Sequence, residues 1–288
     1  MQRGEDTVRV IKVRCCALVL ALLLAGCAAP QVAGNPAAVG AAPPAAGPTL
    51  AAGPVTVIAL GDSLTAGDGD DAGKGFVGRL TEAIAARPGR EGSTLTNLGQ
   101  SGWDSTMMVS GLDGGAPAEL PQAVAAARAA APGAVLATVL IGSNDLWYVY
   151  QNGAVDPTPR VEEDAMVTTY RANLERTLTE LQAAGAVVVV GLPDDQSARP
   201  ISADMGRLNQ QLSDVTAEEV GKMSTLAGVL DRTAAEVAAA HGAPTVDTND
   251  PFWADPARMA DDGIHPNAAG YTALAELWTG GVAPLLGA

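Results

Sequence analysis

Apolar segments of strand length recur along the chain from residue 55 onward, and each ends in a polar turn. Five segments have the length and composition of strands: 55–60, 94–98, 134–141, 186–192 and 244–246. The segment at 134–141 is continuously apolar, which is typical of a central strand that is buried on both faces.

Amphipathic stretches lie between these segments. Three of them carry apolar residues at the spacing of one helix face: Phe76, Val77, Leu80 and Ile84; Met166, Tyr170, Leu174, Leu178 and Leu181; and Tyr271, Leu274, Leu277 and Trp278. Another helix is predicted from about Ala118 until Pro132 stops it, and 208–240 is predicted to be helical with an interruption at Gly221 or Gly228. Strands that alternate with helices predict an α/β fold with a parallel sheet covered on both sides.

The first predicted strand ends abruptly at Gly61-Asp62-Ser63. Ligands of open α/β sheets bind beyond the carboxyl ends of the strands, so Ser63 is a candidate nucleophile. The alternative is that Ser63 is only the N-cap of the next helix, because a serine hydroxyl accepts a backbone N–H at that position.

Two more predicted strands end in polar turns that contain glycine. The second runs into residues 99–105, where Gly102 lies, and the third runs into Gly142-Ser143-Asn144-Asp145. Glycine at a strand end indicates a tight turn or a close approach of the backbone to a ligand. The structural alternatives are that Gly102 only permits a turn and that Asn144 only caps a helix.

His265 is one of two histidines in the chain, and it follows Asp262 by three residues in Asp262-Gly263-Ile264-His265-Pro266. A serine nucleophile needs a base that takes its proton and a third group that holds this base in one tautomer. Asp262 and His265 supply both groups from one short loop, although Asp262 could instead only close an Asx-turn.

Composition narrows the possible partners. The 288 residues carry a net charge of −15 and only 3% aromatic side chains. This balance argues against nucleic acid and anionic surfaces as partners, and it leaves little material for base stacking. The acidic, glycine-rich loop 68–75 matches neither a calcium loop nor a phosphate loop, since Ala72 and Arg79 occupy ligand positions and Gly75 follows Lys74. We interpret it as a solvated loop at the rim.

The N-terminal residues are predicted to be an export signal and not part of the fold. An apolar core at 16–25 follows basic residues and ends in Leu24-Ala25-Gly26-Cys27, which resembles the lipobox of bacterial lipoproteins. We therefore expect a signal peptide over 1–27, lipidation at Cys27, an Ala/Pro/Gly-rich flexible tether over 28–53 and one domain over 54–288. An ordinary signal peptide is the alternative.

The cysteines agree with that division. All three, Cys15, Cys16 and Cys27, lie in or at the edge of the predicted signal. A mature chain that begins at Cys27 would have no second cysteine, which excludes an internal disulfide and a cysteine metal site.

In this order and context, the polar turns resemble the sequence blocks of the SGNH, or GDSL, hydrolase family. The matching blocks are Gly61 to Leu64, Asn97 to Gly102, Gly142 to Asp145 and Asp262 to Pro266. Ser143 departs from the pattern, since family members often have glycine there. The resemblance implies a three-layer α/β/α fold with a flavodoxin-like parallel sheet of about five strands, and ester hydrolysis without a metal or other cofactor.

The resemblance also implies roles for single residues. Ser63 would attack the acyl carbonyl, His265 would take and return the proton, and Asp262 would orient His265. The oxyanion hole would use the N–H groups of Ser63 and Gly102 and the side-chain amide of Asn144. Trp103 and Trp147 come closely after these blocks, so they are expected either to line the substrate cleft or to pack in the core.

The function expected from these residues is a serine esterase that acts on small acyl or acetyl esters, with acylated carbohydrate and acylated lipid as candidate substrates. An acyltransferase that uses the same site is one alternative, and a non-catalytic envelope-binding lipoprotein is another. The expected location is the outer side of a bacterial membrane, held by the lipid at Cys27, or secretion into the medium.

Overall fold

The computed structural model describes residues 47–112, 114–151, 159–212 and 215–287, and the side chains of 159–161 are not part of this description. The predicted signal peptide over 1–27, its Cys27 and the tether as far as residue 46 lie outside the described residues. Within the described ranges, no helix is long and apolar enough to cross a bilayer.

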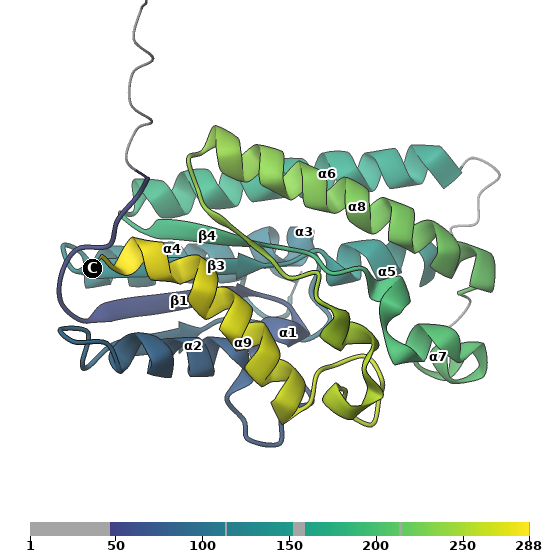
Figure 1. Ribbon diagram of the computed structural model, residues 1–288. Helices are drawn as coiled ribbons and strands as arrows, with labels where there is room; N and C mark the ends of the chain where they lie inside the picture. Colours follow the sequence, from purple (N-terminus) through teal and green to yellow (C-terminus); the bar gives the residue numbers. More distant parts are fainter. Residues whose placement is uncertain (1–46, 113, 152–158, 213–214, 288) are drawn as a thin grey trace, which may run out of the picture. The chain divides into compact units, whose positions relative to one another are not determined.

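Five strands form one parallel sheet in the order β2-β1-β3-β4-β5 (Figure 1). The strands are β1 (Val55–Gly61), β2 (Thr94–Asn97), β3 (Ala134–Leu140), β4 (Val187–Leu192) and β5 (Thr245–Asp247). This order is that of flavodoxin-like folds. The predicted fold class is therefore confirmed, including the number of strands.

Helices cover both faces of the sheet (Figure 1). One face packs against α2 (Gly75–Ala85) and α9 (Ala268–Val282), and the other against α3 (Ser105–Ser110), α4 (Glu119–Ala130), α5 (Ser143–Gln151), α6 (Pro159–Ala183) and α8 (Ala217–Ala240). The remaining short helices are α1 (Ser63–Ala66), α7 (Met205–Gln211), η1 (Gln196–Ala198), η2 (Pro200–Ala203), η3 (Pro251–Ala254), η4 (Pro256–Arg258) and η5 (Ala283–Leu286).

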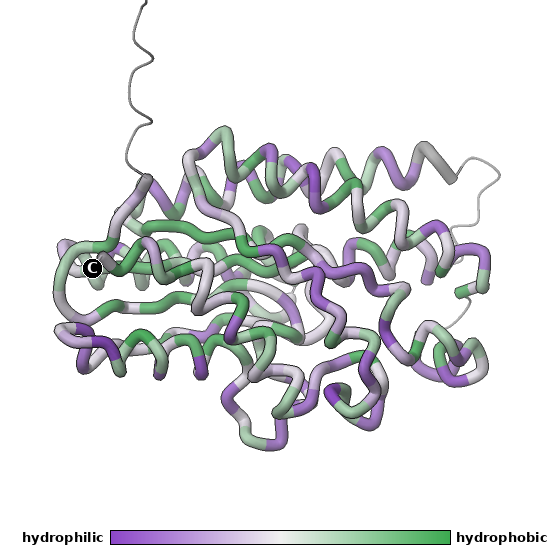
Figure 2. The backbone as a smooth tube through the Cα atoms, viewed as in Figure 1, coloured by the Kyte–Doolittle hydropathy of each residue, from purple (hydrophilic) through white to green (hydrophobic). Residues whose placement is uncertain are grey.

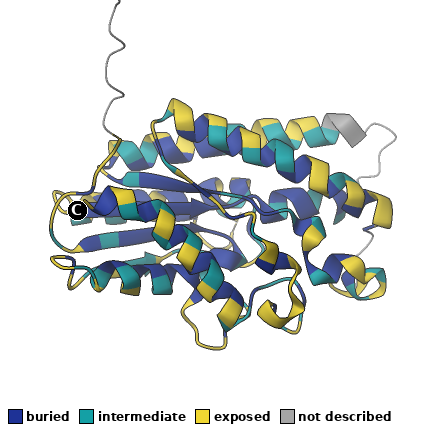
Figure 3. Ribbon diagram, in the orientation of Figure 1, coloured by how far each residue is buried: buried dark blue, intermediate teal, exposed yellow. Residues whose placement is uncertain are grey.

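Strand alternation divides the core into two layers. On β1, Ile58 and Leu60 pack toward α4 and α6, whereas Val57 and Ala59 pack toward α2 and α9. Every residue of β3 is buried, as its continuous apolar sequence predicts. Strands β1, β3 and β4 are accordingly mostly hydrophobic in Figure 2 and mostly buried in Figure 3. This packed sheet is the support on which the strand-end turns rest.

The predicted interruption at Gly221 or Gly228 is wrong, because α8 continues through both glycines. The helical region is instead divided earlier, between the end of α7 at Gln211 and the start of α8 at Ala217. Thr216 and Glu219 form a capping box there, which satisfies N–H groups at the start of α8. A glycine costs a helix about 1 kcal/mol relative to alanine, and the long buried face of α8 offsets that cost.

Candidate active site

Ser63 is the first residue of α1, two residues after the end of β1. The N-cap of α1 is Asp62, whose side chain accepts the N–H of Leu64 at 2.9 Å. The alternative interpretation of Ser63 as the cap is therefore wrong, and its hydroxyl is free for another partner. The turn requires glycine at position 61, where φ is +149° and a Cβ atom would lie 2.0 Å from the carbonyl oxygen of Leu140.

The partner of the Ser63 hydroxyl is His265. Its Nε2 lies 2.8 Å from Ser63 Oγ, and its Nδ1 lies 2.6 Å from Asp262 Oδ2. A carboxylate can only accept, so Nδ1 carries the proton and Nε2 accepts from the Ser63 hydroxyl. The structure thus brings together three residues that the sequence predicts for one site, two of them from a loop about two hundred residues beyond the first.

Asp262 holds the turn and the imidazole at the same time. Its Oδ1 accepts the N–H groups of Ile264 and His265 at 2.8 and 2.9 Å, while Oδ2 bonds to the imidazole. Burial opposes ionisation of this carboxyl, but the hydrogen bonds from His265 and from the two backbone N–H groups lower its pKa to about 2. Asp262 is therefore a carboxylate at any pH near neutrality. The Asx-turn and the orienting contact are both present.

The predicted oxyanion donors lie around the same pocket of about 210 Å³, which Ser63, Gly102, Asn144 and His265 line. Asn144 is at the start of α5, and its Nδ2 donates to the carbonyl of Trp103 at 2.8 Å. The carbonyl of Gly102 accepts from the hydroxyl of Tyr148 at 2.5 Å. As the first helical residue of α1, Ser63 has an N–H without an acceptor within the helix. The first two contacts hold Asn144 and Gly102 in place, and the N–H of Ser63 is held by the start of α1.

The two tryptophans differ in their surroundings. Trp103 is 4% exposed and is not among the residues that line the pocket. Trp147 is 3% exposed and does line it, with its Nε1 donating to Gln196 Oε1 at 2.6 Å. Core packing therefore describes the ring of Trp103, whereas Trp147 is both a core residue and part of the pocket wall.

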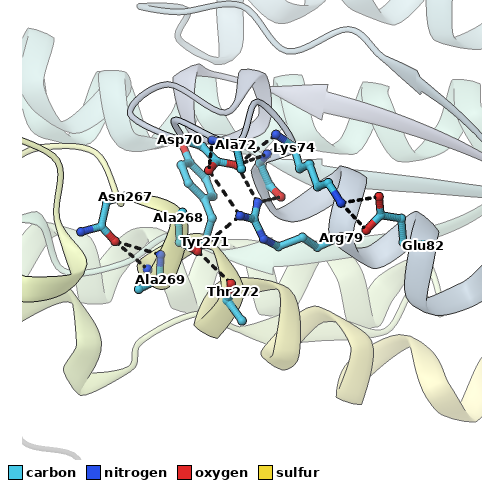
Figure 4. Close-up of polar contacts among 12 residues, drawn as sticks. Asp70, Ala72, Lys74, Arg79, Glu82, Asn267, Ala268, Ala269, Tyr271 and Thr272 are labelled. Carbon is cyan, nitrogen blue, oxygen red and sulfur yellow. Dashed lines mark hydrogen bonds and ion pairs between the residues drawn. The ribbon is translucent and has the colours of Figure 1, made fainter.

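The loop 68–75 does more than the solvated loop that the sequence predicts. Residues 71–74 are exposed, but Asp70 is buried and accepts the N–H groups of Ala72, Lys74 and Gly75 (Figure 4). The guanidinium of Arg79 donates to the same carboxylate at 2.6 Å. Burial opposes ionisation of Asp70, but Arg79 and the three N–H groups lower its pKa to about 2. An aspartate followed by an arginine one turn into a helix is the sequence signal that could have revealed this contact.

Asp68 and Gly69 of the same loop contact three parts of the protein: the turn that contains Gly102, helix α9 and His265. The carboxylate of Asp68 accepts from the hydroxyl of Ser101 at 2.6 Å, next to Gly102. Its carbonyl accepts from the hydroxyl of Tyr271 at 2.8 Å, on α9. A Cβ at Gly69 would lie 2.9 Å from the Cβ of His265, so the loop packs directly against the histidine.

Arg199 is a residue that the sequence does not single out. It lines the pocket, and its side chain is 2% exposed. Two of its nitrogens donate to Asp194 at 2.9 and 2.8 Å, and a third donates to the carbonyl of Ile264 at 3.0 Å. The guanidinium carbon lies 4.6 Å from the ring centroid of Trp253. Arg199 thus holds the backbone directly before His265.

Two buried carboxyls lie behind the candidate nucleophile. Glu119 on α4 accepts the N–H of Gly61 at 2.8 Å. Burial raises the pKa of Glu119 to about 9, against the effect of the Gly61 N–H and together with the charge of Asp62. Burial likewise raises the pKa of Asp62 to about 6, although the Leu64 N–H and Arg199 oppose this shift. Glu119 is therefore neutral near pH 7 and adds no charge beneath Ser63.

Other features of the surface do not coincide with this chemistry. A larger groove of about 540 Å³ runs between α2 and α9 beside Arg79, and it contains none of the predicted site residues. Within the part of the chain that the structure describes, no cluster of three or more His, Cys, Asp or Glu side chains could hold a metal ion. Because Ser63, Gly102, Asn144 and His265 line the smaller pocket, we regard it as the candidate site.

Comparison with protein families matches residues 59–273 to the GDSL-like lipase/acylhydrolase family. A catalytic mutant of an acetylxylan esterase from Geobacillus stearothermophilus is a similar solved structure, with 18% identity, a TM-score of 0.56 and coverage of 82% of this chain and 96% of that chain. An α/β hydrolase from the metagenome of Lake Arreo, Spain, has 21% identity, a TM-score of 0.54 and coverage of 82% and 97%. Identities this low show a shared fold. The search of curated proteins gave no match.

Proposed function

The chain belongs to the GDSL-like lipase/acylhydrolase family, and we propose that within it the protein is a serine esterase acting on small acyl or acetyl esters. The observation that carries the proposal is the chain of two hydrogen bonds from Asp262 through His265 to the hydroxyl of Ser63, at 2.6 and 2.8 Å. These are the contacts that activate a serine, because the base accepts the hydroxyl proton while the carboxylate holds its tautomer.

In the proposed reaction, Ser63 Oγ attacks the ester carbonyl and its proton passes to His265 Nε2. The protonated His265 then gives that proton to the departing alcohol, which leaves an acyl group on Ser63. Water attacks this acyl-enzyme in the same way, with His265 again accepting a proton and returning it to Ser63. The N–H groups of Ser63 and Gly102 and the amide of Asn144 stabilise the negative oxygen in both steps, each contributing about 3–4 kcal/mol by analogy with known donors.

The size of the pocket supports a small acyl group. Its volume of about 210 Å³ is below the roughly 300–1,000 Å³ of common ligand pockets. The acetylxylan esterase among the similar structures has an acetylated carbohydrate as its named substrate, which supports the same class here. Among the candidate substrates, we therefore prefer acetylated carbohydrate to acylated lipid.

The test is a screen of p-nitrophenyl esters of graded chain length with the full chain. We expect turnover to be highest for acetate, and to disappear in Ser63→Ala but not in the matched control Ser110→Ala, which changes an exposed serine at the end of α3. Wild-type turnover in Ser63→Ala would overturn the mechanism. Inactivity of the wild type on every ester would favour the non-catalytic alternative, and an ester product formed with an added alcohol would show the acyltransferase.

We also propose export, with lipid attachment at Cys27 and the Ala/Pro/Gly-rich segment 28–53 as a tether between the lipid and the domain at 54–288. The support is the Leu24-Ala25-Gly26-Cys27 sequence after an apolar core. Cys27→Ser is expected to move the protein out of the membrane fraction, whereas Cys16→Ser, inside the predicted signal, should not. A mature wild-type N-terminus beyond Cys27 in the medium would contradict lipidation and support plain secretion.

A further inference from the structure

The orientation of the Gln196 side-chain amide is set by a hydrogen bond from Trp147. The indole Nε1 of Trp147 donates to its Oε1 at 2.6 Å. An indole N–H can only donate, so the oxygen of the amide must face Trp147 and the NH₂ group must face away from it. The assignment of the two ends of this amide is therefore not arbitrary.

The NH₂ group of Gln196 is buried and, among the described residues, has no acceptor. The whole residue is 0% exposed. A buried donor without a partner costs about 1–3 kcal/mol, so native proteins rarely keep one without a use. The NH₂ group of Gln196 can therefore donate to an acceptor that does not belong to the described part of the protein.

Gln196 lies on η1 and lines the same pocket as Ser63 and His265. Gln151, one helical turn after Trp147 on α5, also lines this pocket and has a buried amide oxygen without a partner in the described part of the chain. Leu212 and Ile264 are aliphatic members of the lining. Two amides without partners in one small pocket are typical of a site that forms hydrogen bonds with polar groups of a ligand.

We propose that the Gln196 amide donates a hydrogen bond to a substrate oxygen outside the reacting ester group. This inference rests on the proposed esterase function and deepens it. The enzyme then selects esters that carry a hydroxyl, ether or ring oxygen near the ester, such as acylated polyols and sugars, over alkyl esters of the same size. The discrimination follows because an alkyl analogue leaves the buried NH₂ group unpaired.

The decisive variant is Gln196→Met. Methionine has a similar length, no donor, and a sulfur that is a weak acceptor for the Trp147 N–H. A glutamate would not isolate the donor, because burial raises the pKa of a carboxyl, as it does for Glu119, and a neutral carboxyl donates through its O–H. The matched control is Gln122→Met, the same chemical change at an exposed position on α4. Gln196→Leu, which also lacks a donor, serves as the second variant if methionine prevents folding.

Two pairs of esters isolate the hydrogen bond. Glyceryl 1-acetate and propyl acetate have the same acyl group and the same number of carbons in the alcohol, and they differ only in two hydroxyls. The p-nitrophenyl esters of methoxyacetic and butyric acid place an ether oxygen or a methylene at the same position of the acyl chain. The full chain is assayed on all four, and each pair gives one ratio of kcat/KM values.

We expect the wild type to prefer the oxygen-bearing member of at least one pair, and this preference to fall about tenfold in Gln196→Met, as expected for loss of one hydrogen bond. Gln122→Met should keep the wild-type ratio. The inference is overturned if the wild type shows no preference, or if both ratios are unchanged in the folded Gln196 variants, in which case only water occupies the donor. A wild type that hydrolyses none of the four esters would instead overturn the proposed function itself.

Discussion

The two halves of the site are held in place by different means. Ser63 lies two residues after the end of β1, which pairs along its length with β3 and also with β2. It begins a helix that Asp62 caps. His265 lies in the irregular stretch between β5 and α9, where an isolated bridge from Met259 to Pro266 is the local β pairing. The nucleophile is thus placed by backbone structure, and the base mainly by side chains.

The contacts on the histidine side come from two sources, the distant segment around residues 199–201 and the neighbouring Asn267. Arg199 binds the carbonyl of Ile264, and the N–H of Ile201 donates to the carbonyl of Gly263 at 3.2 Å. The side chain of Asn267 donates to the carbonyls of Ala257 and Met259. On the serine side, the corresponding support comes from the backbone hydrogen bonds that pair β1 with β2 and β3. The comparison predicts that substituting a supporting side chain lowers activity more on the histidine side than on the serine side.

Loss of either reacting group should have the largest effect. We expect Ser63→Ala and His265→Ala each to lower kcat by about 10⁴-fold or more, with the double variant little worse, because the two groups act as one unit. His241→Ala, which changes the other histidine at the end of α8, should retain activity. Steady-state kinetics on p-nitrophenyl acetate measure this, and additive losses in the double variant would contradict a shared step.

Loss of the Arg199 contacts, which support only the histidine side, should have the second-largest effect. Arg199→Met leaves the buried carboxylate of Asp194 without its partner, which is expected to destabilise the fold by about 3–5 kcal/mol. Arg199→Lys keeps the charge but not the fork that contacts Asp194 and Ile264 together, so we expect kcat to fall at least tenfold while most stability remains. Urea unfolding combined with kcat measurements separates the two effects. An Arg199→Lys enzyme with wild-type kcat would mean that the arginine does not position His265.

Acid should lower the stability of the fold through Asp70 and Asp262, the two carboxylates whose pKa values are lowered. Asp70 and Asp262 each have a folded-state pKa of about 2, below the ordinary value of 3.8, so they stabilise the fold above pH 4 and lose this contribution as the pH falls from about 4 to 2. For the buried Asp70, the shift corresponds to about 2 kcal/mol. Asp70→Asn should therefore flatten the fall of unfolding free energy between pH 5 and pH 3, and an unchanged slope would contradict it.

Glu119 offers the smallest effect and the matching control on the serine side. Its pKa of about 9 means that it is already neutral at pH 7, so Glu119→Gln keeps both the charge and an oxygen for the Gly61 N–H. We expect nearly unchanged kcat. Because the raised pKa makes stability fall as the pH rises from about 4.5 toward 9, the glutamine should be somewhat more stable at pH 8. A large loss of kcat would show that the serine side, too, depends on a side chain.

The same contrast explains what the sequence could predict. The strands, the strand-end turns and the residues Ser63, Asp262 and His265 were accessible because their signals are local: an apolar run, a glycine, or a carboxylate three residues before a histidine. The contact of Asp70 with Arg79 is also local, nine residues apart, although the prediction of a solvated loop missed it. Gln196 and Arg199 could not be predicted in this way. Their roles depend on Trp147 and Ile264, which lie 49 residues from Gln196 and 65 residues from Arg199, respectively. No spacing rule connects such positions before the fold is known.

The helix break illustrates the opposite error. A glycine is a local signal against helix, and the sequence alone favours a break at Gly221 or Gly228. The structure keeps α8 intact because buried residues such as Met223 and Leu230 lie along its face. A local propensity of about 1 kcal/mol is smaller than the packing of a single buried leucine.

The central claim is that Ser63 becomes acylated during turnover, and covalent labelling tests it most directly. The full chain is treated with a fluorophosphonate, digested, and analysed by mass spectrometry for the modified peptide. We predict one adduct, on Ser63, that forms rapidly in the wild type, very slowly in His265→Ala and not at all in Ser63→Ala. An adduct on Ser101 or Ser143, which line the same pocket, or labelling that persists in Ser63→Ala, would contradict the account.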